Sequence, residues 1–227
     1  MLLEKFLIRI IHYAVNLITS KDFDIVYQIR VDATQETLQY VKDNNITPKL
    51  MILENKKFFD KVTKHLNDNG LILEFGVANG DSVNQIAKLL PKKIVYGFDS
   101  FEGLPSEWFT CDKASFSLKG KQPKVEHNVN LIKGLFEDTL SGFLKNHKDN
   151  ISLLHVDCDL YEPTKYVLDL LSDRIVSGTY IIFDEYWNYP NWKNHEFKAF
   201  NEFLLKTNKK FEYVTFNGQT TVCVKII

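Results

Sequence analysis

The sequence predicts an α/β fold: a Rossmann-like, doubly wound sheet of five parallel strands that ends in an antiparallel hairpin and follows an N-terminal helical cap. Short apolar runs alternate with helical segments from Leu71 onward, which favours a parallel sheet covered on both faces. The runs are continuous, as in strands buried on both sides. The last two runs are separated by only three residues, and strands joined so closely must be antiparallel.

We expect two parts in the chain, a helical cap over residues 1–68 and the sheet domain over residues 69–227. Within the cap, polar-periodic segments at 36–43 and 55–66 flank a break at 44–48. No linker rich in Gly, Pro or Ser separates the cap from the remainder. The cap is therefore expected to pack on the main domain.

The first residues of the cap, 1–17, are strongly apolar but are interrupted by Glu4, Lys5, Arg9 and His12. A membrane-spanning helix needs about 20 nearly uncharged residues. A signal peptide has its charge first, then an apolar run and a small-residue cleavage site. Because the segment fits neither pattern, we expect an amphipathic helix that packs on the body or on a partner subunit, which makes it a candidate contact for a homo-oligomer. A helix lying on a membrane surface is the alternative.

The sheet domain can be divided into strands and helices from the same periodicity. The expected parallel strands are residues 71–75, 94–98, 129–132, 151–156 and 180–183. The expected helices are residues 83–90, 138–146, 164–172 and 195–205. The hairpin strands are 211–216 and 220–226, joined by Asn217-Gly218-Gln219. Such an ending is unusual for a nucleotide-binding sheet and is the layout expected of class I methyltransferases.

The composition sets the class of protein and its compartment. The 227 residues suffice for one sizeable domain, and 44 % hydrophobic residues are ordinary for a globular protein. Lys and Arg (28) nearly balance Asp and Glu (29), so no nucleic-acid partner is expected. Cys111, Cys158 and Cys223 are far apart and odd in number, which indicates neither a zinc cluster nor a disulfide framework. A reducing, cytoplasmic location is the simplest expectation.

The loop after the first strand, LEFGVANGDS at residues 73–82, has the form E-x-G-x-x-x-G and opens a helix. Gly76 permits a tight turn and close approach of the backbone to a ligand. Ser82 is expected to cap the helix, so that free N–H groups face the ligand. The dinucleotide fingerprint G-x-G-x-x-G is absent, which suits a ligand without phosphates. Asp99 ends the second strand, where an acid can accept both hydroxyls of a ribose. A structural turn, with Asp99 as a cap or turn residue, is the alternative.

Carboxylates follow two later strands. Asp157 and Asp159 come after the fourth strand, and Asp184 and Glu185 come after the fifth. These strands are neighbours about 4.8 Å apart in a doubly wound sheet, and their carboxyl ends form its ligand crevice. Asp157 and Asp159 are two apart, so an extended backbone would point both into this crevice. Four such groups repel one another unless a cation is present, and their oxygens suit Mg²⁺. Capping of the helices and turns that follow is the alternative role.

Three segments carry a family resemblance: YGFDSFEGLP at 96–105, KGLFEDTL at 133–140 and HVDCDLYEPT at 155–164. In this order they resemble the macrocin O-methyltransferase family of class I S-adenosylmethionine-dependent methyltransferases, and the likeness covers roughly residues 70–205. That family acts on sugar hydroxyls in antibiotics and related metabolites.

The resemblance implies a cofactor site for S-adenosyl-L-methionine. It implies that the methionine part contacts Glu74, Gly76 and Ser82 and that the ribose contacts Asp99. Phe136 and Glu137 would then lie near the adenine.

The resemblance also implies the catalytic centre. Metal ligands are expected at Asp157, Asp184 and Glu185, and the general base at Asp159, although the family often has Asp where Glu185 stands. The implied function is metal-dependent transfer of a methyl group to a hydroxyl of a sugar or sugar-bearing metabolite. A cation can lower the pKa of a bound oxygen, and a carboxylate can take its proton, which an alcohol nucleophile needs at neutral pH.

Other functions fit the sequence less well. A nicotinamide oxidoreductase is disfavoured by the missing third glycine and by the terminal hairpin. A cofactor-binding scaffold is disfavoured by the intact loop and the carboxylates. Hydroxylases of small metabolites are also described on this fold and are a further alternative.

Some conspicuous residues have two interpretations. His155 is more typical of a core histidine than of a catalytic one. His195 and Glu196 are typical of a helix start, with a substrate contact as the alternative. The long loop at 108–122 is a candidate lid. Four aromatic residues after the fifth strand could line a sugar site or simply pack: Tyr186, Trp187, Tyr189 and Trp192.

Overall fold

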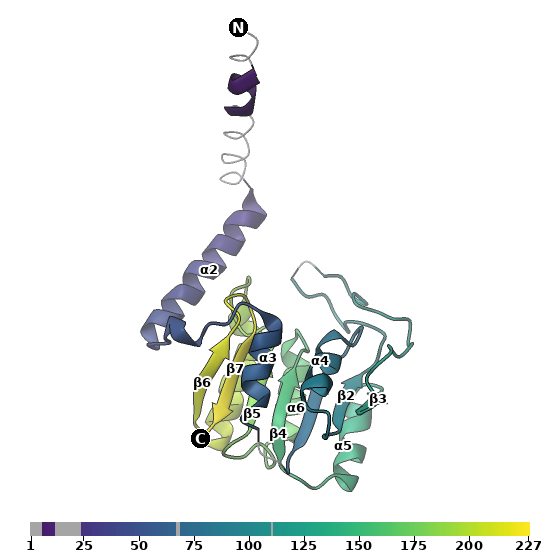
Figure 1. Cartoon of the computed structure of the whole chain (residues 1–227). Helices are drawn as coiled ribbons and strands as arrows, with labels where there is room; N and C mark the ends of the chain where they lie inside the picture. Colours follow the sequence, from purple (N-terminus) through teal and green to yellow (C-terminus); the bar gives the residue numbers. More distant parts are fainter. Residues whose placement is uncertain (1–5, 12–23, 67–68, 110) are drawn as a thin grey trace.

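The computed structural model describes residues 6–11, 24–66, 69–109 and 111–227. In this part of the chain, seven strands form one sheet in the order β3-β2-β1-β4-β5-β7-β6 (Figure 1). The strands are β1 (Leu71–Phe75), β2 (Val95–Asp99), β3 (Val129–Lys133), β4 (Ile151–Val156), β5 (Tyr180–Phe183), β6 (Phe211–Phe216) and β7 (Val222–Ile226). The first five run parallel, and β7 lies antiparallel between β5 and β6. The predicted fold class is confirmed.

The last strand begins later than the sequence predicts. Residues 220 and 221 belong to the hairpin turn rather than to β7. The side chain of Asn217 accepts the N–H groups of Gln219 and Thr221, and it also donates to the hydroxyl of Thr221. Asn commonly organises a turn in this way by binding nearby backbone groups.

The helices cover the sheet on two sides. They are α2 (Ile25–Asp43), η1 (Pro48–Leu50), α3 (Asn55–Thr63), α4 (Asp81–Leu89), α5 (Phe136–Asn146), α6 (Tyr161–Leu170), η2 (Trp192–Asn194) and α7 (Glu196–Thr207). One core joins α3 and α4 to one face, as with Val62 and Val83 against Ile72. The other joins α5, α6 and α7 to the opposite face and includes Leu73 of β1 and Phe200 of α7. Alternate residues of β1 therefore serve different cores.

Three helices begin two or three residues earlier than predicted. The early turns of α4, α5 and α6 contain acidic residues, three of which the sequence interpretation left in loops: Asp81, Glu137 and Glu162. Negative charge near a helix N-terminus is favourable because the peptide dipoles place partial positive charge there. Pro163 also fits the first turn of α6, where its missing N–H costs nothing.

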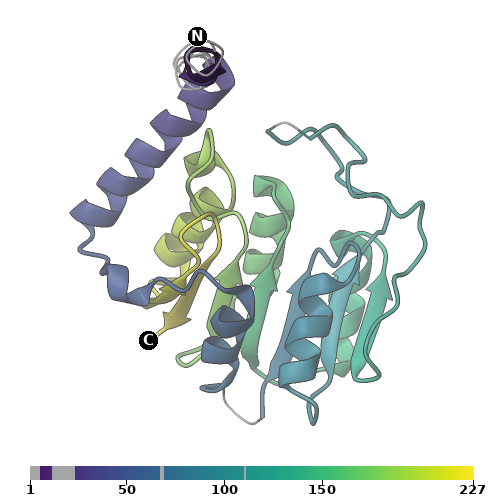
Figure 2. The same ribbon diagram turned by 45° about the horizontal axis from the view of Figure 1, so that its top comes forward.

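Helix α2 contacts the body mainly through its second half, although Arg30 in its first half lies over the ring of Phe109, 5.5 Å from its centroid. Its Thr37 hydroxyl accepts the N–H of Asn188, and its Tyr40 hydroxyl pairs with that of Tyr213 at 2.8 Å. The first turns of α2 project away from the sheet (Figures 1 and 2) and leave the apolar Ile25 and Val26 exposed. The expected packing of the cap on the main domain is therefore wrong for these turns.

The N-terminal apolar segment lies partly outside the described residues, which lack 1–5 and 12–23. Residues 6–11 are helical, and the apolar Phe6, Leu7, Ile8, Ile10 and Ile11 are exposed. Packing on the body, as expected for this helix, is thus not found for residues 6–11. Among the helices in the described ranges, none is both long and apolar enough to cross a membrane.

Candidate active site

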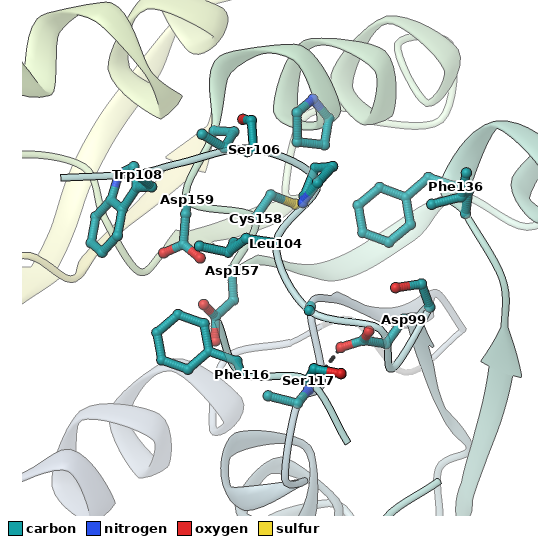
Figure 3. Close-up of a pocket in the computed structure, with 18 of the residues that line it drawn as sticks. Asp99, Leu104, Ser106, Trp108, Phe116, Ser117, Phe136, Asp157, Cys158 and Asp159 are labelled. Atoms are coloured by element: carbon teal, nitrogen blue, oxygen red, sulfur yellow. Dashed lines mark hydrogen bonds between the residues drawn. The ribbon is translucent and has the colours of Figure 1, made fainter. Parts of the chain in front are cut away.

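A cavity of about 1080 Å³ opens at the carboxyl ends of the parallel strands. Figure 3 shows Trp108 and Asp159 on one side of it and Asp99 and Phe136 on the other. Its volume is at the upper end of the usual range for small-molecule sites, about 300–1,000 Å³, so a nucleoside cofactor and a second small molecule could share it. The predicted residues Gly76, Asp99, Phe136, Glu137, Asp157, Asp159, Asp184 and Glu185 all line this cavity.

The glycine loop lies directly against the loop that follows β4. Gly76 has a φ of +92°, and a Cβ there would lie 1.8 Å from the carbonyl oxygen of Asp157. Its N–H donates to the carbonyl of Phe98, while the N–H of Asp157 donates to the carbonyl of Phe75. Only glycine combines this conformation with so close an approach. The sequence-based interpretation of Gly76 as a close-approach residue is therefore supported, although its neighbour here is backbone.

The role expected for Ser82 as a helix cap is wrong. Helix α4 begins at Asp81, and its N-cap is Gly80 in the left-handed conformation. Ser82 is already inside the first turn, and its hydroxyl donates to Glu74 Oε1 at 2.9 Å. Gly80 adopts the left-handed conformation without strain, and it has no side chain with which to cap the helix.

Glu74 and Ser82 lie beneath the glycine loop and are not part of the cavity wall. The Glu74 side chain is fully buried, and its Oε2 lies 3.1 Å from Nδ1 of His155. Burial alone would lower the pKa of His155, but the hydrogen bond and the charge of Glu74 outweigh it, so the pKa is raised. His155 is thus a buried, paired histidine, in keeping with its interpretation as a core residue. Contacts of Glu74 and Ser82 with a cofactor remain predictions.

Asp99 organises the same loop from the end of β2. Its Oδ2 accepts the N–H groups of Val77 and Ala78, each at 2.8 Å, and its Oδ1 accepts the N–H of Phe101 at 2.6 Å. An ionised carboxylate offers about four acceptor positions, so a ligand hydroxyl can still be accommodated. Phe136 stands at the first position of α5 with its ring edge-on to Phe75.

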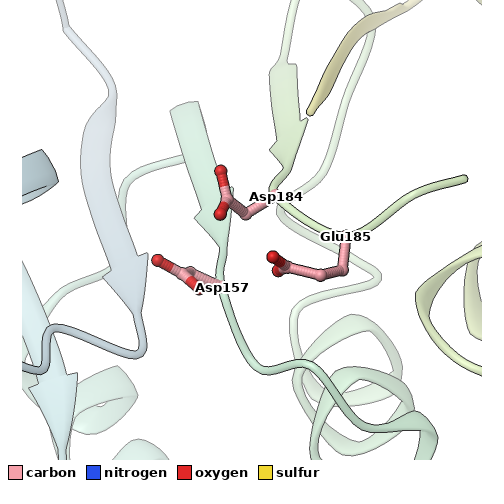
Figure 4. Close-up of side chains that lie close together, drawn as sticks. All are labelled: Asp157, Asp184 and Glu185. Atoms are coloured by element: carbon pink, nitrogen blue, oxygen red, sulfur yellow. The ribbon is translucent and has the colours of Figure 1, made fainter. Parts of the chain in front are cut away.

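Three carboxylates converge at the ends of β4 and β5 (Figure 4). Asp157, Asp184 and Glu185 each present an oxygen, and these atoms all lie within 4.8 Å of one another. The two strands are paired neighbours up to Val156 and Phe183, so the residues that follow emerge side by side. The geometric part of the sequence prediction, that these acids meet in one crevice, is correct.

Asp159 reaches the cavity for a different reason from the one predicted. Its φ is +59°, in the left-handed region, so the segment after β4 is not extended. The side chain is buried, and burial together with the charge of Asp184 raises its pKa to about 6, with the hydrogen bond to Glu185 acting in the opposite direction. Burial, followed by the neighbouring charges, also raises the pKa values of Asp157 and Glu185 well above their ordinary range.

The donor set fits a hard divalent cation. All three groups are carboxylates, the ligands that Mg²⁺ and similar ions take. Among the described residues, the buried Oε2 of Glu185 has no hydrogen-bond partner, and a buried unpaired oxygen of this kind is costly. Asp184 is steadied by the Thr221 hydroxyl, which donates to its Oδ1 at 3.0 Å.

Glu196, interpreted from the sequence mainly as a helix-start residue, belongs to this site in a way that the sequence interpretation did not predict. It is the first residue of α7 and is completely buried. Its Oε1 accepts the N–H of Cys158 at 3.3 Å, and its Oε2 accepts the N–H of Glu185 at 3.1 Å. Burial and the charges of Asp159 and Asp184 raise its pKa well above the ordinary value, against the lowering effect of the two N–H groups. The sequence offered no signal for this role, because an acid at a helix start is ordinary.

The aromatic residues after β5 serve mainly as packing. Tyr186, Trp187 and Trp192 are buried, and the last two rings contact Tyr40 of α2 edge-on. Tyr189 lies nearer the cavity, where its ring is 5.5 Å from Trp108 and its hydroxyl donates to the carbonyl of Glu185. Trp108 comes from the long loop, which thereby supplies part of the cavity wall.

Without a bound cation, the protein is expected to become less stable as the pH rises from about 5 to about 7. The folded protein holds protons on Asp157, Asp159 and Glu185 that the unfolded chain has already released, because their folded pKa values are raised. Their contribution is complete below the ordinary carboxyl pKa near 4 and is lost as the pH passes through the raised values. Thermal unfolding in chelator across this range measures the effect. A melting temperature that increases with pH there would contradict it.

The comparisons with known proteins point to one family. The macrocin-O-methyltransferase (TylF) family model matches residues 116–208, which contain Asp157, Asp159, Asp184 and Glu185. This match confirms the resemblance to the macrocin-O-methyltransferase family. It also confirms the predicted class of enzyme, an O-methyltransferase. A search of curated proteins gave no match.

Several solved structures share the fold of this chain. CalS11, a calicheamicin methyltransferase, has a TM-score of 0.64 and 22 % identity over 86 % of this chain and 91 % of its own. The O-methyltransferase NovP has a TM-score of 0.55 and 20 % identity over 75 % of this chain and 78 % of its own. An O-methyltransferase from Bacillus cereus, in complex with SAH, has a TM-score of 0.51 and 15 % identity over 86 % of this chain and 90 % of its own. At these identities the likeness establishes the fold.

Proposed function

We propose that the protein transfers the methyl group of S-adenosylmethionine to a hydroxyl of a sugar or sugar-bearing metabolite, with a divalent cation at its acid cluster. The observation that carries this proposal is the convergence of two loops in one cavity. The glycine loop with Asp99 supplies one part of its wall, and Asp157, Asp159, Asp184 and Glu185 supply an adjoining part.

The cofactor end would be occupied by S-adenosylmethionine. Gly76 lets the backbone approach a ligand closely, Asp99 would accept ribose hydroxyls, and Phe136 with Glu137 would lie beside the adenine. The SAH complex of the Bacillus cereus enzyme, which has the same fold, supports this choice. The sulfonium would then face the acid cluster across the cavity.

The catalytic end would act on the acceptor. Asp157, Asp184 and Glu185 would hold a divalent cation such as Mg²⁺, which when bound neutralises part of their charge and makes a coordinated hydroxyl more acidic. Asp159, with its pKa of about 6, is largely ionised at neutral pH and can take the hydroxyl proton. The acceptor oxygen forms its bond to the methyl carbon as the carbon–sulfur bond breaks, which leaves S-adenosylhomocysteine.

The acceptor class follows from the family and from one structural feature. The matched family takes its name from macrocin, and CalS11 is described as a TDP-rhamnose 3′-O-methyltransferase in a second structure, with 22 % identity and a TM-score of 0.56 over 86 % of this chain and 93 % of its own. In this chain, Trp108 lines the cavity beside Asp159 (Figure 3) and offers an apolar surface for a sugar ring. A sugar hydroxyl is therefore the proposed nucleophile.

S-Adenosylmethionine and S-adenosylhomocysteine are expected to raise the melting temperature, whereas NAD is not. A ligand at one hundred times its Kd stabilises the folded state by about 2.7 kcal/mol. The loop lacks the third glycine that admits a pyrophosphate. Thermal-shift titrations with all three compounds make the comparison, and equal stabilisation by NAD would reject the cofactor assignment.

Chelation is expected to abolish turnover and to leave cofactor binding largely intact, because the proposed cofactor contacts, such as Asp99 and Phe136, are not among the three converging acids that would hold the cation. The assay incubates the protein with labelled methyl donor and a panel of glycosides, or a cell extract, and detects the labelled product and S-adenosylhomocysteine by mass spectrometry. Added Mg²⁺ should restore the product. Full activity in excess chelator would remove the cation from the mechanism. Cofactor binding with no methylated product under any condition would favour a binding scaffold.

A further inference from the structure

The two loops that carry the acid cluster are joined by a side chain that does not line the cavity. Direct pairing between β4 and β5 ends at Val156 and Phe183, and the N–H of Asp184 makes the next bond, to the Val156 carbonyl. Beyond that point, the left-handed Asp159 turns its segment away from the strand direction. The carboxylate of Glu196 then spans the two segments, with one oxygen on the N–H of Cys158 and the other on the N–H of Glu185.

Each of these bonds is close to a residue of the cluster. Cys158 stands between Asp157 and Asp159, and Glu185 is itself one of the three converging acids. A movement of either peptide group would therefore change the spacing of the oxygens that would hold the cation. The side chains of Asp159 and Glu185 also interact, but the Glu196 carboxylate is the group that accepts from the backbone of both segments.

The location of Glu196 is costly in electrostatic terms. It is completely buried and lies near Asp159 and Asp184, so a neutral side chain would fill the same space with less repulsion. A carboxylate is nevertheless the side chain that can accept from two N–H groups at once. Glutamine offers one acceptor and one donor, so one of the two N–H groups would face another donor.

We propose that Glu196 is the positioning residue of the acid cluster: it fixes the spacing between the β4 and β5 loops, and thereby the affinity for the divalent cation and the aim of Asp159, without touching cation or acceptor. This inference rests on the proposed function. Residues that orient metal ligands from outside the coordination sphere typically change metal affinity by about 10- to 100-fold when mutated.

The test compares Glu196→Gln with a matched substitution on the same helix, Glu202→Gln. Glu202 is partly exposed and bonds Tyr161 and Lys165 at the surface. Mn²⁺ binding to the full chain is measured by titration calorimetry, without any acceptor, and S-adenosylhomocysteine binding is measured in parallel. Glu196→Gln is expected to weaken Mn²⁺ binding by about 10- to 100-fold and to leave S-adenosylhomocysteine binding within about twofold of wild type. Glu202→Gln is expected to change neither.

Activity gives a second readout that a purely structural role would not produce. The Mn²⁺ concentration needed for half-maximal formation of S-adenosylhomocysteine should rise in Glu196→Gln by the same factor as the dissociation constant. If Glu196→Gln does not fold, Glu196→Asp takes its place, since it keeps the charge but is one methylene too short to reach both N–H groups. It should show the same selective loss.

The outcomes separate this proposal from the proposed function. Wild-type Mn²⁺ affinity in the folded glutamine or aspartate variant would overturn the positioning role alone. An equal loss of Mn²⁺ and S-adenosylhomocysteine binding would also overturn it, because that pattern indicates general disruption. Absence of Mn²⁺ binding in the wild-type protein would overturn both this inference and the cation of the proposed function.

Discussion

Asp159→Asn is expected to slow methyl transfer by about 10²- to 10⁴-fold, the usual range for loss of a general base. The amide has the same shape as the carboxylate but cannot take the hydroxyl proton. Asp159 is not one of the three converging acids, so Mn²⁺ and cofactor binding should persist. Single-turnover formation of S-adenosylhomocysteine measures the chemical step, and calorimetry measures the binding.

Two further variants make the role assignment specific. Asp157→Asn should lose cation affinity, because Asp157 belongs to the acid cluster. Asp149→Asn, the same chemical change at an exposed position before β4, should behave like wild type. A wild-type rate in Asp159→Asn would leave the cluster in place and remove its proposed base.

Gly76→Ala is expected to destabilise the protein by about 2–6 kcal/mol, a large part of the 5–15 kcal/mol typical of a domain. Alanine is strained at a φ of +92°, and its methyl group would lie 1.8 Å from the Asp157 carbonyl oxygen. Either the glycine loop or the acid loop must move. Any folded fraction should therefore lose affinity for both S-adenosylhomocysteine and Mn²⁺.

Gly142→Ala provides the control for this substitution. Gly142 lies within α5, and among the described residues no atom is within 4 Å of a Cβ built there. Alanine favours a helix over glycine by about 0.5–1 kcal/mol, so this variant should be as stable as wild type or more so. Urea unfolding of both variants measures the difference. Equal stability of Gly76→Ala and wild type would mean that the two loops are not in the close contact described here.

The sheet and the acid cluster could be predicted from the sequence for a simple physical reason. Parallel strands buried on both faces must be apolar throughout, so β1, β4 and β5 stand out at their observed bounds. Their carboxyl ends share one edge, so Asp157 and Asp184 had to be neighbours once the strand order was assumed. The family resemblance added the assignment of roles, which remain proposals.

The errors concern features that depend on packing rather than on pattern. Ser82 looks like a helix cap, but the N-cap is Gly80, two residues earlier, and Ser82 bonds Glu74 from inside the first turn. Glu196 looks like any acid at a helix start, and its bonds to Cys158 and Glu185 exist only after the chain has brought distant loops together. The direction of α2 is likewise fixed by a few contacts, such as that of Thr37, and not by its periodicity.

The position of β1 and β4 at the centre of the sheet affects how the protein fluctuates. Every residue of both strands is buried, and each strand is hydrogen-bonded on both edges. Segments of this kind open only with the whole domain, whereas exposed elements open locally at little cost. The glycine loop follows β1 and the acid loop follows β4. The backbone amide hydrogens of these two strands should therefore be among the last to exchange with solvent deuterium. The first turns of α2 should exchange early, and their opening should leave the geometry of the cavity unchanged.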